Sequence, residues 1–250
     1  MTMSEEGGYL GAMTFHCLFG GAIERVLQSR RDDPNALHEL QNLRATLRQA
    51  DIASPSFLFD FTKILLSNSR LSINIQEAFL RMQASAPTDD LELPDSKEPE
   101  FYELSVRAIA LRRVLARVPD EMSDRRTFLE TIKEIASSIK KLLDATNAVM
   151  QVVPRSAQQS VEKRKKEFVH YSKRFSNTLK EYFRDQNATQ VSVSANQLIF
   201  QTTLIIKTVR EKVKKVCWLL KQFHFCSRYV NLFEYVGRMW QEFESFFFLG

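Results

Sequence analysis

The feature that most constrains this chain is a long region where apolar residues recur every three or four positions with few helix breakers. The stretch from Pro119 to Met150 shows it best: Pro119 and Asp120 end one segment, and Ser123 or Asp124 can cap the next. The apolar positions that follow are Leu129, Ile132, Ala136, Ile139, Leu143 and Thr146, and this stripe is expected to face a core. Seven glycines and seven prolines in 250 residues favour long helices over sheets. The sequence therefore predicts an all-α protein.

The same repeat predicts helices along the rest of the chain. Short helices are expected over 15–28, 34–51, 57–65 and 72–82, and long ones over 101–118, 124–150, 156–184 and from 193 onward. The short helices make a small unit with a thin core, which favours pairing with another chain. The alternative is that they fold back on the C-terminal half as one domain. The long helices, joined by short turns, predict an antiparallel up-and-down four-helix bundle.

Residues 85–99 separate these two regions, and their three prolines and five acidic residues predict a linker or an exposed hinge. The last 41 residues are rich in aromatic side chains, and we assign them no function. We favour the interpretation that they come from an alternative splice product or a misread exon. The predicted organisation is a flexible N-terminus over 1–14, a helical dimerisation domain over 15–84, a linker over 85–99, a bundle over 100–209 and an aromatic-rich extension over 210–250.

Composition and motifs exclude several classes of function. The net charge is +5, but basic and acidic residues alternate, so the chain does not resemble a nucleic-acid-binding body. Three cysteines without a CxxC pair indicate reduced thiols in a cytoplasmic protein. Neither a signal peptide nor a membrane-spanning segment is expected. With no phosphate-binding loop, no metal-ligand spacing and four dispersed histidines, we expect neither an enzyme nor a cofactor.

Lysines at helical spacing suggest a binding groove instead. Lys133 and Lys140 lie seven residues apart, or about 10 Å along one side of a helix. Lys166, Lys173 and Lys180 repeat this spacing beside an aromatic stripe on the next long helix. Two such helices side by side would hold an acidic amphipathic helix between lysine rows. The alternative is that these lysines only solvate the outer face of a bundle.

An apolar floor for this groove is predicted between the lysines. Its members are Ile132, Ala136 and Ile139 on one helix and Phe175 and Leu179 on the other. Some of these residues must also serve the bundle core. A different reading comes from the basic runs 163–166 and 212–215, which predict contact with acidic lipid headgroups; the alternative for 163–166 is a solvated helix face.

Three stretches carry a resemblance to a known family: EPEFYELSVRAIALRRVLARVPDEMSDRRTFLETIKEIASSIKKLLDATNAV, KKEFVHYSKRFSNTLKEYF and VSVSANQLIFQTTLIIKTV. They closely resemble the programmed cell death protein 10 family, also called cerebral cavernous malformations protein three. The match is dense over 98–209 and weaker over 15–84. The resemblance implies a non-catalytic adaptor that acts in cell junctions, migration, survival and vascular or tubular development.

The same resemblance implies particular partners. The N-terminal domain would pair with germinal-centre group III Ste20-like kinases, or with a second copy when no kinase is present. The bundle would resemble the focal adhesion targeting domain and bind striatin-family proteins, LD-motif proteins such as paxillin, and the cerebral cavernous malformations scaffold partner. Phosphoinositides are a further expected ligand and nucleic acid is not. The expected location is the cytoplasm, with recruitment to the Golgi and plasma membrane by partners.

The resemblance also assigns residues to these interactions. Lys133, Lys140, Lys173 and Lys180 match the basic positions of the family's LD-peptide groove. The apolar dimer-interface positions correspond to Leu43, Ile64 and Leu65. Thr46 stands where the family has a small alanine at that interface, and one residue is inserted between Ile64 and Asn74.

Overall fold

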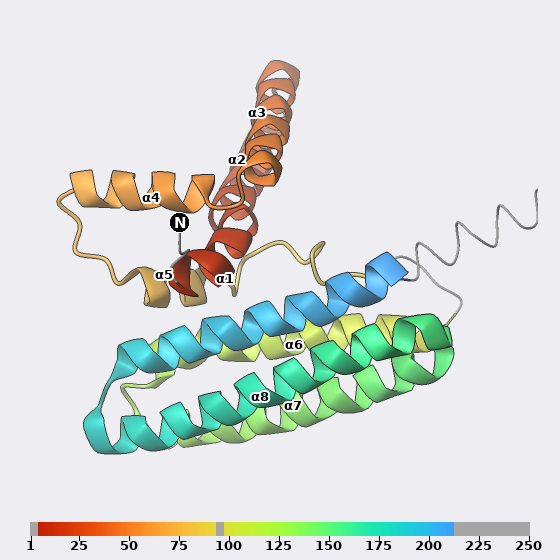
Figure 1. Ribbon diagram of the computed structural model, residues 1–250. Helices are drawn as coiled ribbons and strands as arrows, with labels where there is room; N and C mark the ends of the chain where they lie inside the picture. The colour runs from red at the N-terminus through yellow and green to blue at the C-terminus, as the bar shows by residue number, and fades with distance from the viewer. Residues whose placement is uncertain (1–4, 94–97, 213–250) are drawn as a thin grey trace, which may run out of the picture. The chain divides into compact units, whose positions relative to one another are not determined.

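The computed structural model describes residues 5–93 and 98–212, and these form helices joined by turns and loops without a strand (Figure 1). The chain divides into two compact units, 1–208 and 209–250. The helices described below belong to the first unit, and the last of them is considered only up to residue 208. The prediction of an all-α fold is confirmed. The aromatic-rich extension predicted over 210–250 lies outside the described residues from 213 onward.

The N-terminal region begins with helix α1 (Glu5–Thr14), which runs into a π-helical turn, η1 (Phe15–Gly20), and then into α2 (Gly21–Ser29). We expected a flexible segment over 1–14, but α1 is helical because Tyr9, Leu10 and Met13 are buried. Within η1 a Cβ on Gly20 would lie 3.3 Å from the carbonyl oxygen of Phe15, five residues earlier, which is closer than an ordinary van der Waals contact. Glycine is therefore suited to this turn.

Helices α3 (Pro34–Ala53), α4 (Phe57–Asn68) and α5 (Ile75–Met82) follow. Asp33 caps α3 by accepting hydrogen bonds from the backbone N–H groups of Asn35 and Ala36, both at 3.1 Å. Pro34 occupies the first turn of α3, where its missing N–H costs nothing. Asn74 caps α5 in the same way. These start signals lie in the local sequence, and the helix beginning at Pro34 is confirmed.

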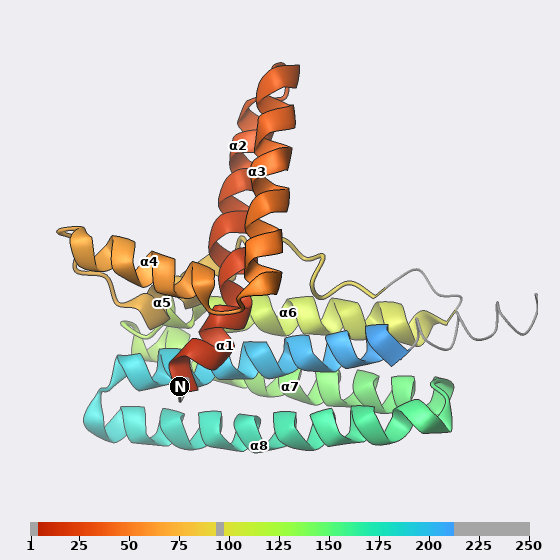
Figure 2. The same cartoon turned by 45° about the horizontal axis from the view of Figure 1, so that its top comes forward.

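The longer helices are α6 (Pro99–Glu121), α7 (Arg125–Val152), α8 (Arg155–Asp185) and a last helix over 188–212, called the 188–212 helix below. Both views show α6, α7, α8 and the 188–208 part of the last helix side by side, each running opposite to the one before (Figures 1 and 2). Helix α6 contacts α7 extensively, and α7 contacts α8. The arrangement agrees with antiparallel long helices; its likeness to the focal adhesion targeting domain stays a prediction.

The boundaries of these helices have local causes. Asp124 caps α7 through the backbone N–H of Arg126 at 3.0 Å. Helix α6 continues past Pro119 to Glu121, whereas we expected it to end at 118; a proline so near the end of a helix sacrifices a single backbone bond. Gln186 ends α8 in a left-handed conformation with φ of 55°, and Asn187 then caps the 188–212 helix.

The core of the long helices consists of large apolar side chains that are fully buried: Leu104, Leu111, Leu115, Phe128, Ile135, Leu142, Phe168, Phe175 and Leu198. Phe128 packs edge-on against Tyr182, with ring centroids 5.5 Å apart, and its ring is tilted against that of Phe183 at 5.8 Å. Closely packed rings of this kind stabilise the fold beyond the area they bury. They fix the end of α8 on the start of α7.

A polar network ties residues 87–90 to the helices. The buried Arg112 on α6 donates to Asp90 at 2.8 Å and to the carbonyl oxygen of Pro87 at 2.7 Å. His16 in η1 lies 3.1 Å from Asp90 Oδ1 and 2.7 Å from the same Pro87 oxygen. Nearby, Leu91 is fully buried. This part of the segment predicted as a linker is therefore held by tertiary contacts.

Candidate functional site

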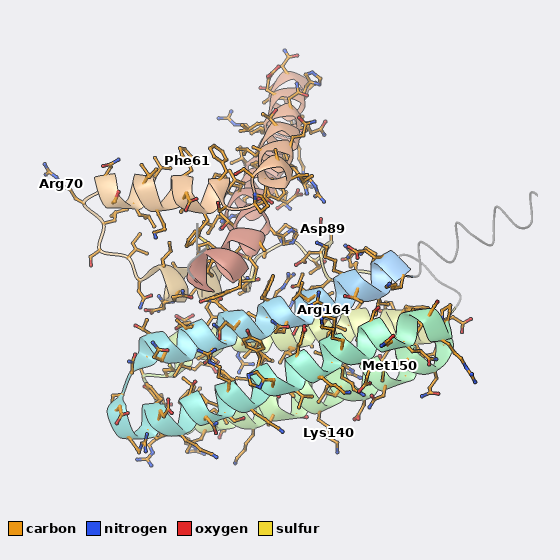
Figure 3. The ribbon with its side chains drawn as sticks, in the orientation of Figure 1. Phe61, Arg70, Asp89, Lys140, Met150 and Arg164 are labelled. Atoms are coloured by element: carbon orange, nitrogen blue, oxygen red, sulfur yellow. The ribbon has the colours of Figure 1, made fainter. Side chains whose placement is uncertain are left out.

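The first candidate surface is formed by lysines of α7 and α8. Lys133 and Lys140 on α7 are exposed, as are Lys173 and Lys180 on α8. Figure 3 shows Lys140 extending from α7 into open space. Among the described residues none of these four lysines has a carboxylate within 4.0 Å of its ammonium nitrogen. Their charges are thus available to an acidic partner.

Other basic residues of the same helices behave differently. Lys165 pairs with Glu162 at 2.7 Å and also donates to Asn147, while Arg164 pairs with Glu167 at 2.7 Å. Half of the basic run 163–166 is therefore neutralised within α8. Lys163 and Lys166 remain exposed without an ion pair in the described part of the chain.

The apolar residues predicted for the groove floor divide into two groups. Ile132 and Ile139 are half-buried and Ala136 is exposed, so all three reach the surface of α7. Phe175 and Leu179 are buried on the inner side of α8, where they serve the core. Next to Lys133, a hollow of about 490 Å³ is lined by Asp124, Arg125, Arg126, Leu129 and Glu130. The surface near the lysines thus combines charge with apolar side chains from α7.

The second candidate surface lies on α3 and α4. Leu43 is 48% exposed, Ile64 is 58% exposed and Leu65 is 53% exposed. Helix α3 has no buried residue over its 20 positions. Large apolar side chains remain exposed on α3, on α4 and just after α4: Leu43, Ile52, Phe57, Phe61, Ile64, Leu65, Leu71 and Ile73. Monomeric proteins rarely leave so many apolar side chains in water in one region.

The orientation of α4 explains why these residues are left outside. Leu58 and Phe59 are the buried residues of α4, so they take the inward face. Phe57 and Phe61 instead stack on each other, with ring centroids 6.2 Å apart, and stay partly exposed. Thr46 is exposed, and its hydroxyl donates to the carbonyl oxygen of Asn42 at 2.9 Å within α3. A partner that covers Thr46 therefore leaves no hydroxyl unpaired.

Sequence reasoning did not single out Phe57, Leu71 and Ile73 as surface residues of this region. The signal that could have found them is the excess of apolar residues over 57–73, which is more than one helix face can bury. Leu43, Ile64 and Leu65 do belong to the same exposed apolar set. Their role at a dimer interface stays a prediction.

No described helix combines the length and apolar character that crossing a bilayer requires. Within 5–93 and 98–212, no three His, Cys, Asp or Glu side chains are placed to hold a metal ion. The buried thiol of Cys17 is kept neutral, because burial raises its pKa to about 12. The described part of the chain is thus helical and carries two exposed surfaces, one basic and one apolar.

Comparison with known proteins supplies the family. A family model described as "Programmed cell death protein 10, C-terminal" matches residues 73–181. A relative from Caenorhabditis elegans, "Programmed cell death protein 10 homolog", is 61% identical over 214 residues, which cover 85% of this chain and 100% of the relative. The chain belongs to the programmed cell death protein 10 family.

Proposed function

We propose that this protein is a non-catalytic adaptor that joins a kinase to larger assemblies. Through α3 and α4 it pairs with germinal-centre group III Ste20-like kinases, or with a second copy of itself. Through α7 and α8 it binds LD-motif proteins such as paxillin, striatin-family proteins and the cerebral cavernous malformations scaffold partner. It works in the cytoplasm and is recruited to the Golgi and plasma membrane by these partners.

The observation that supports this proposal most is the exposed apolar set on α3 and α4. Helix α3 contacts α2, α4 and η1, yet none of its residues is fully buried and Leu43 stays about half exposed. Covering such side chains releases free energy in proportion to the apolar area removed from water. Interfaces of permanent dimers resemble a protein core divided between two chains, and this surface has that character.

The test is to place charge on this surface. In the double variant Leu43→Asp, Ile64→Asp, both positions are about half exposed, so the monomer tolerates the carboxylates. At a dimer interface the same charges are buried without partners, which costs about 3–5 kcal/mol and weakens association by about a hundredfold or more. Sedimentation equilibrium and binding to a kinase tail measure the effect.

A matched control is Tyr102→Asp on α6, where the side chain is 75% exposed outside this set. It should leave both the oligomeric state and kinase binding unchanged. If the double variant sediments as wild type and still captures the kinase tail, the interface does not lie on α3 and α4.

The lysine surface supports the second half of the proposal. An LD-type helix presents leucines at i, i+3, i+4 and i+7 with acidic residues beside them. The unpaired lysines of α7 and α8 would orient those acidic residues, and Ile132, Ala136 and Ile139 would meet the leucines. Each exposed pair contributes less than about 1 kcal/mol. A single Lys→Ala change should therefore weaken binding only slightly.

Reversing all four charges is the sharper experiment. The quadruple variant carries Glu at positions 133, 140, 173 and 180, and its control carries Glu at four exposed basic residues outside the lysine rows: Arg31, Arg113, Arg155 and Lys207. The net charge changes equally in both. Only the first should lose an LD peptide in fluorescence polarisation, while circular dichroism shows both folded. Equal binding by both variants would mean that these lysines only solvate the outer face of the helices.

The alternative function is a peripheral membrane protein that binds acidic phosphoinositides. It is favoured by Lys163 and Lys166, which are exposed on α8 without an ion pair among the described residues. It is weakened by the internal pairing of Arg164 and Lys165. Co-sedimentation with phosphoinositide vesicles separates the two functions, because lipid binding without kinase or LD-peptide binding would support the alternative.

A further inference from the structure

A pocket of about 290 Å³ lies between α1, α8 and the 188–212 helix. It is lined by Gly8, Tyr9, Tyr171, Gln197, Phe200 and Gln201. None of these residues belongs to the lysine surface or to the apolar set on α3 and α4. Its volume is close to the lower end of small-molecule pockets, about 300 Å³, which suits one large side chain.

Two glutamines of this pocket have unsatisfied hydrogen-bonding groups. Gln197 is 6% exposed and Gln201 is 7% exposed, and they lie one turn apart on the same helix face. The Oε1 atoms of both are buried and accept no hydrogen bond. Buried carbonyl oxygens without a donor destabilise a folded protein. Two of them at one pocket indicate that a hydrogen-bond donor is supplied from outside.

The amides can reach such a donor because their last torsion is soft. The preference of a glutamine side chain about its terminal bond is broad, so the amide turns at little cost. The pocket wall beside the two glutamines is held in place by hydrogen bonds. Tyr9 donates to Gln76 Oε1 at 3.1 Å, and Asn196 donates to the same oxygen at 3.2 Å, which holds one side of the pocket in place.

The rest of the lining selects the kind of donor. Tyr9, Tyr171 and Phe200 supply three aromatic rings, so a flat apolar group gains contact area and ring–ring packing there. The lining carries no charged side chain, so an arginine or lysine placed there would lose hydration without a counter-charge. A tyrosine donates as well, but its buried hydroxyl lone pairs would themselves need donors. An indole has one N–H donor and no acceptor.

We propose that this pocket is an anchor site for the indole ring of a tryptophan carried by a partner polypeptide. The ring packs among the three aromatic side chains, and its N–H donates to the Oε1 atom of Gln197 or Gln201. Tryptophan is among the residues that contribute most to protein interfaces, and it does so when its ring fills a pocket of this kind.

The experiment uses the full-length protein and uncharged probes in ligand-observed nuclear magnetic resonance titrations. The first probe is N-acetyltryptophanamide, and the matched probe is its 1-methyl derivative, which keeps the ring but cannot donate. The methylated probe should bind about tenfold more weakly, because it loses one hydrogen bond to a buried acceptor. N-acetyltyrosinamide should also bind more weakly than the tryptophan probe.

Two substitutions locate the binding. Gly8→Phe should fill the pocket and abolish binding, since a Cβ at Gly8 meets no atom within 4 Å and the new ring has room. Gly8→Ala is the control and should bind as wild type. The double variant Gln197→Leu, Gln201→Leu removes both unpaired carbonyl oxygens, so it should keep or raise the melting temperature while removing the preference for the probe with a free N–H.

Three results would overturn the proposal. Equal binding of the two tryptophan probes, or no binding of either, would exclude an indole N–H site. Unchanged binding by both Gly8→Phe and the double glutamine variant would place the site elsewhere, and the double variant decides the matter if Gly8→Phe does not fold. Binding of free indole more tightly than N-acetyltryptophanamide would point to a small molecule instead of a polypeptide.

Discussion

His16 should give the protein a pH-dependent stability that a single substitution removes. Its Nε2 atom lies 2.7 Å from the Pro87 oxygen and 3.1 Å from Asp90 Oδ1, with Asp89 Oδ1 at 3.4 Å. The substitution His16→Gln places an amide N–H near that position but never carries a charge. Comparing it with wild type therefore isolates the contribution of the imidazolium.

The direction follows from the pKa of His16. Burial lowers this pKa, but the hydrogen bond and charge of Asp90 outweigh burial and hold it above the ordinary 6.5. A raised pKa stabilises the folded state fully below pH 6.5, and this contribution disappears as pH rises through the folded-state pKa. Burial alone would raise the pKa of Asp90, but His16 and Arg112 lower it below its ordinary 3.8, so Asp90 stays ionised throughout this range.

The magnitude follows from the kind of hydrogen bond. Bonds to charged groups contribute about 1.5–3 kcal/mol and neutral ones about 0.5–1.5 kcal/mol. Neutral His16 still donates from the same ring, so protonation adds only the difference, about 1 kcal/mol. Arg112 already bonds to Asp90 and lies close to Cys17, whose raised pKa keeps its thiol neutral between pH 5.5 and 8.5.

The assay is urea unfolding followed by circular dichroism at several pH values from 5.5 to 8.5. The free energy of unfolding of wild type should exceed that of His16→Gln at pH 5.5, and this difference should be about 1 kcal/mol larger at pH 5.5 than at pH 8.5. The control His170→Gln changes an exposed histidine on α8 and should show no such pH-dependent difference. A difference in the free energy of unfolding between wild type and His16→Gln that stays constant, or that increases as pH rises, would refute the reasoning.

Three further predictions concern stability and can be checked by thermal or urea unfolding. Phe128→Ala should cost about 3–5 kcal/mol, because a fully buried ring is lost against Tyr182; a loss under 1 kcal/mol would mean that the site collapses to fill the space. Arg112→Met should cost about 3–5 kcal/mol, since the partly buried Asp90 then lacks the guanidinium that bonds it at 2.8 Å, and Asp90→Asn in the same background should recover part of this loss. Asp33→Ala should cost about 1 kcal/mol through the lost cap of α3, visible also as reduced helicity.

Much of the fold could be predicted because its helices are specified by neighbouring residues. Asp33 with Pro34, and Asp124 before α7, are start signals that act through the adjacent backbone. The stripe predicted to face the core from α7 was wrong, because Leu129 and Ala136 are exposed whereas Ile135, Leu142 and Val149 are buried; the existence of α7 did follow from its own residues. Elements of this kind need no knowledge of distant residues.

What could not be predicted depends on contacts between distant residues. The segment 85–93 reads as a linker, yet Arg112 lies 22 positions from Asp90 and holds it. Helix α1 contains three glycines, and its order depends on burial of Tyr9 and Leu10. In both cases tertiary packing outweighs local composition.

The candidate surfaces divide in the same way. Lys133 and Lys180 are exposed because lysines are rarely buried, so their exposure could be predicted from the residue type. Whether Phe175 faces the core or a groove depends on how α8 is rotated against its neighbours, which the sequence does not state. The pocket at Gln197 and Gln201 is formed by residues from three helices, so no local sequence pattern predicts it.

The π-helical turn η1 has a consequence for how this chain can change in length. A π turn holds one residue more than an α turn, so it absorbs an insertion inside a continuous helix. Deleting one residue from Phe15–Gly20 would therefore convert the π turn into an α turn and keep the face that α1 presents to the molecule. Tyr9 and Leu10 would stay in the core. A deletion inside the regular α-helix of α7 has no such turn to absorb it, and it would rotate the residues on one side by about 100° relative to those on the other.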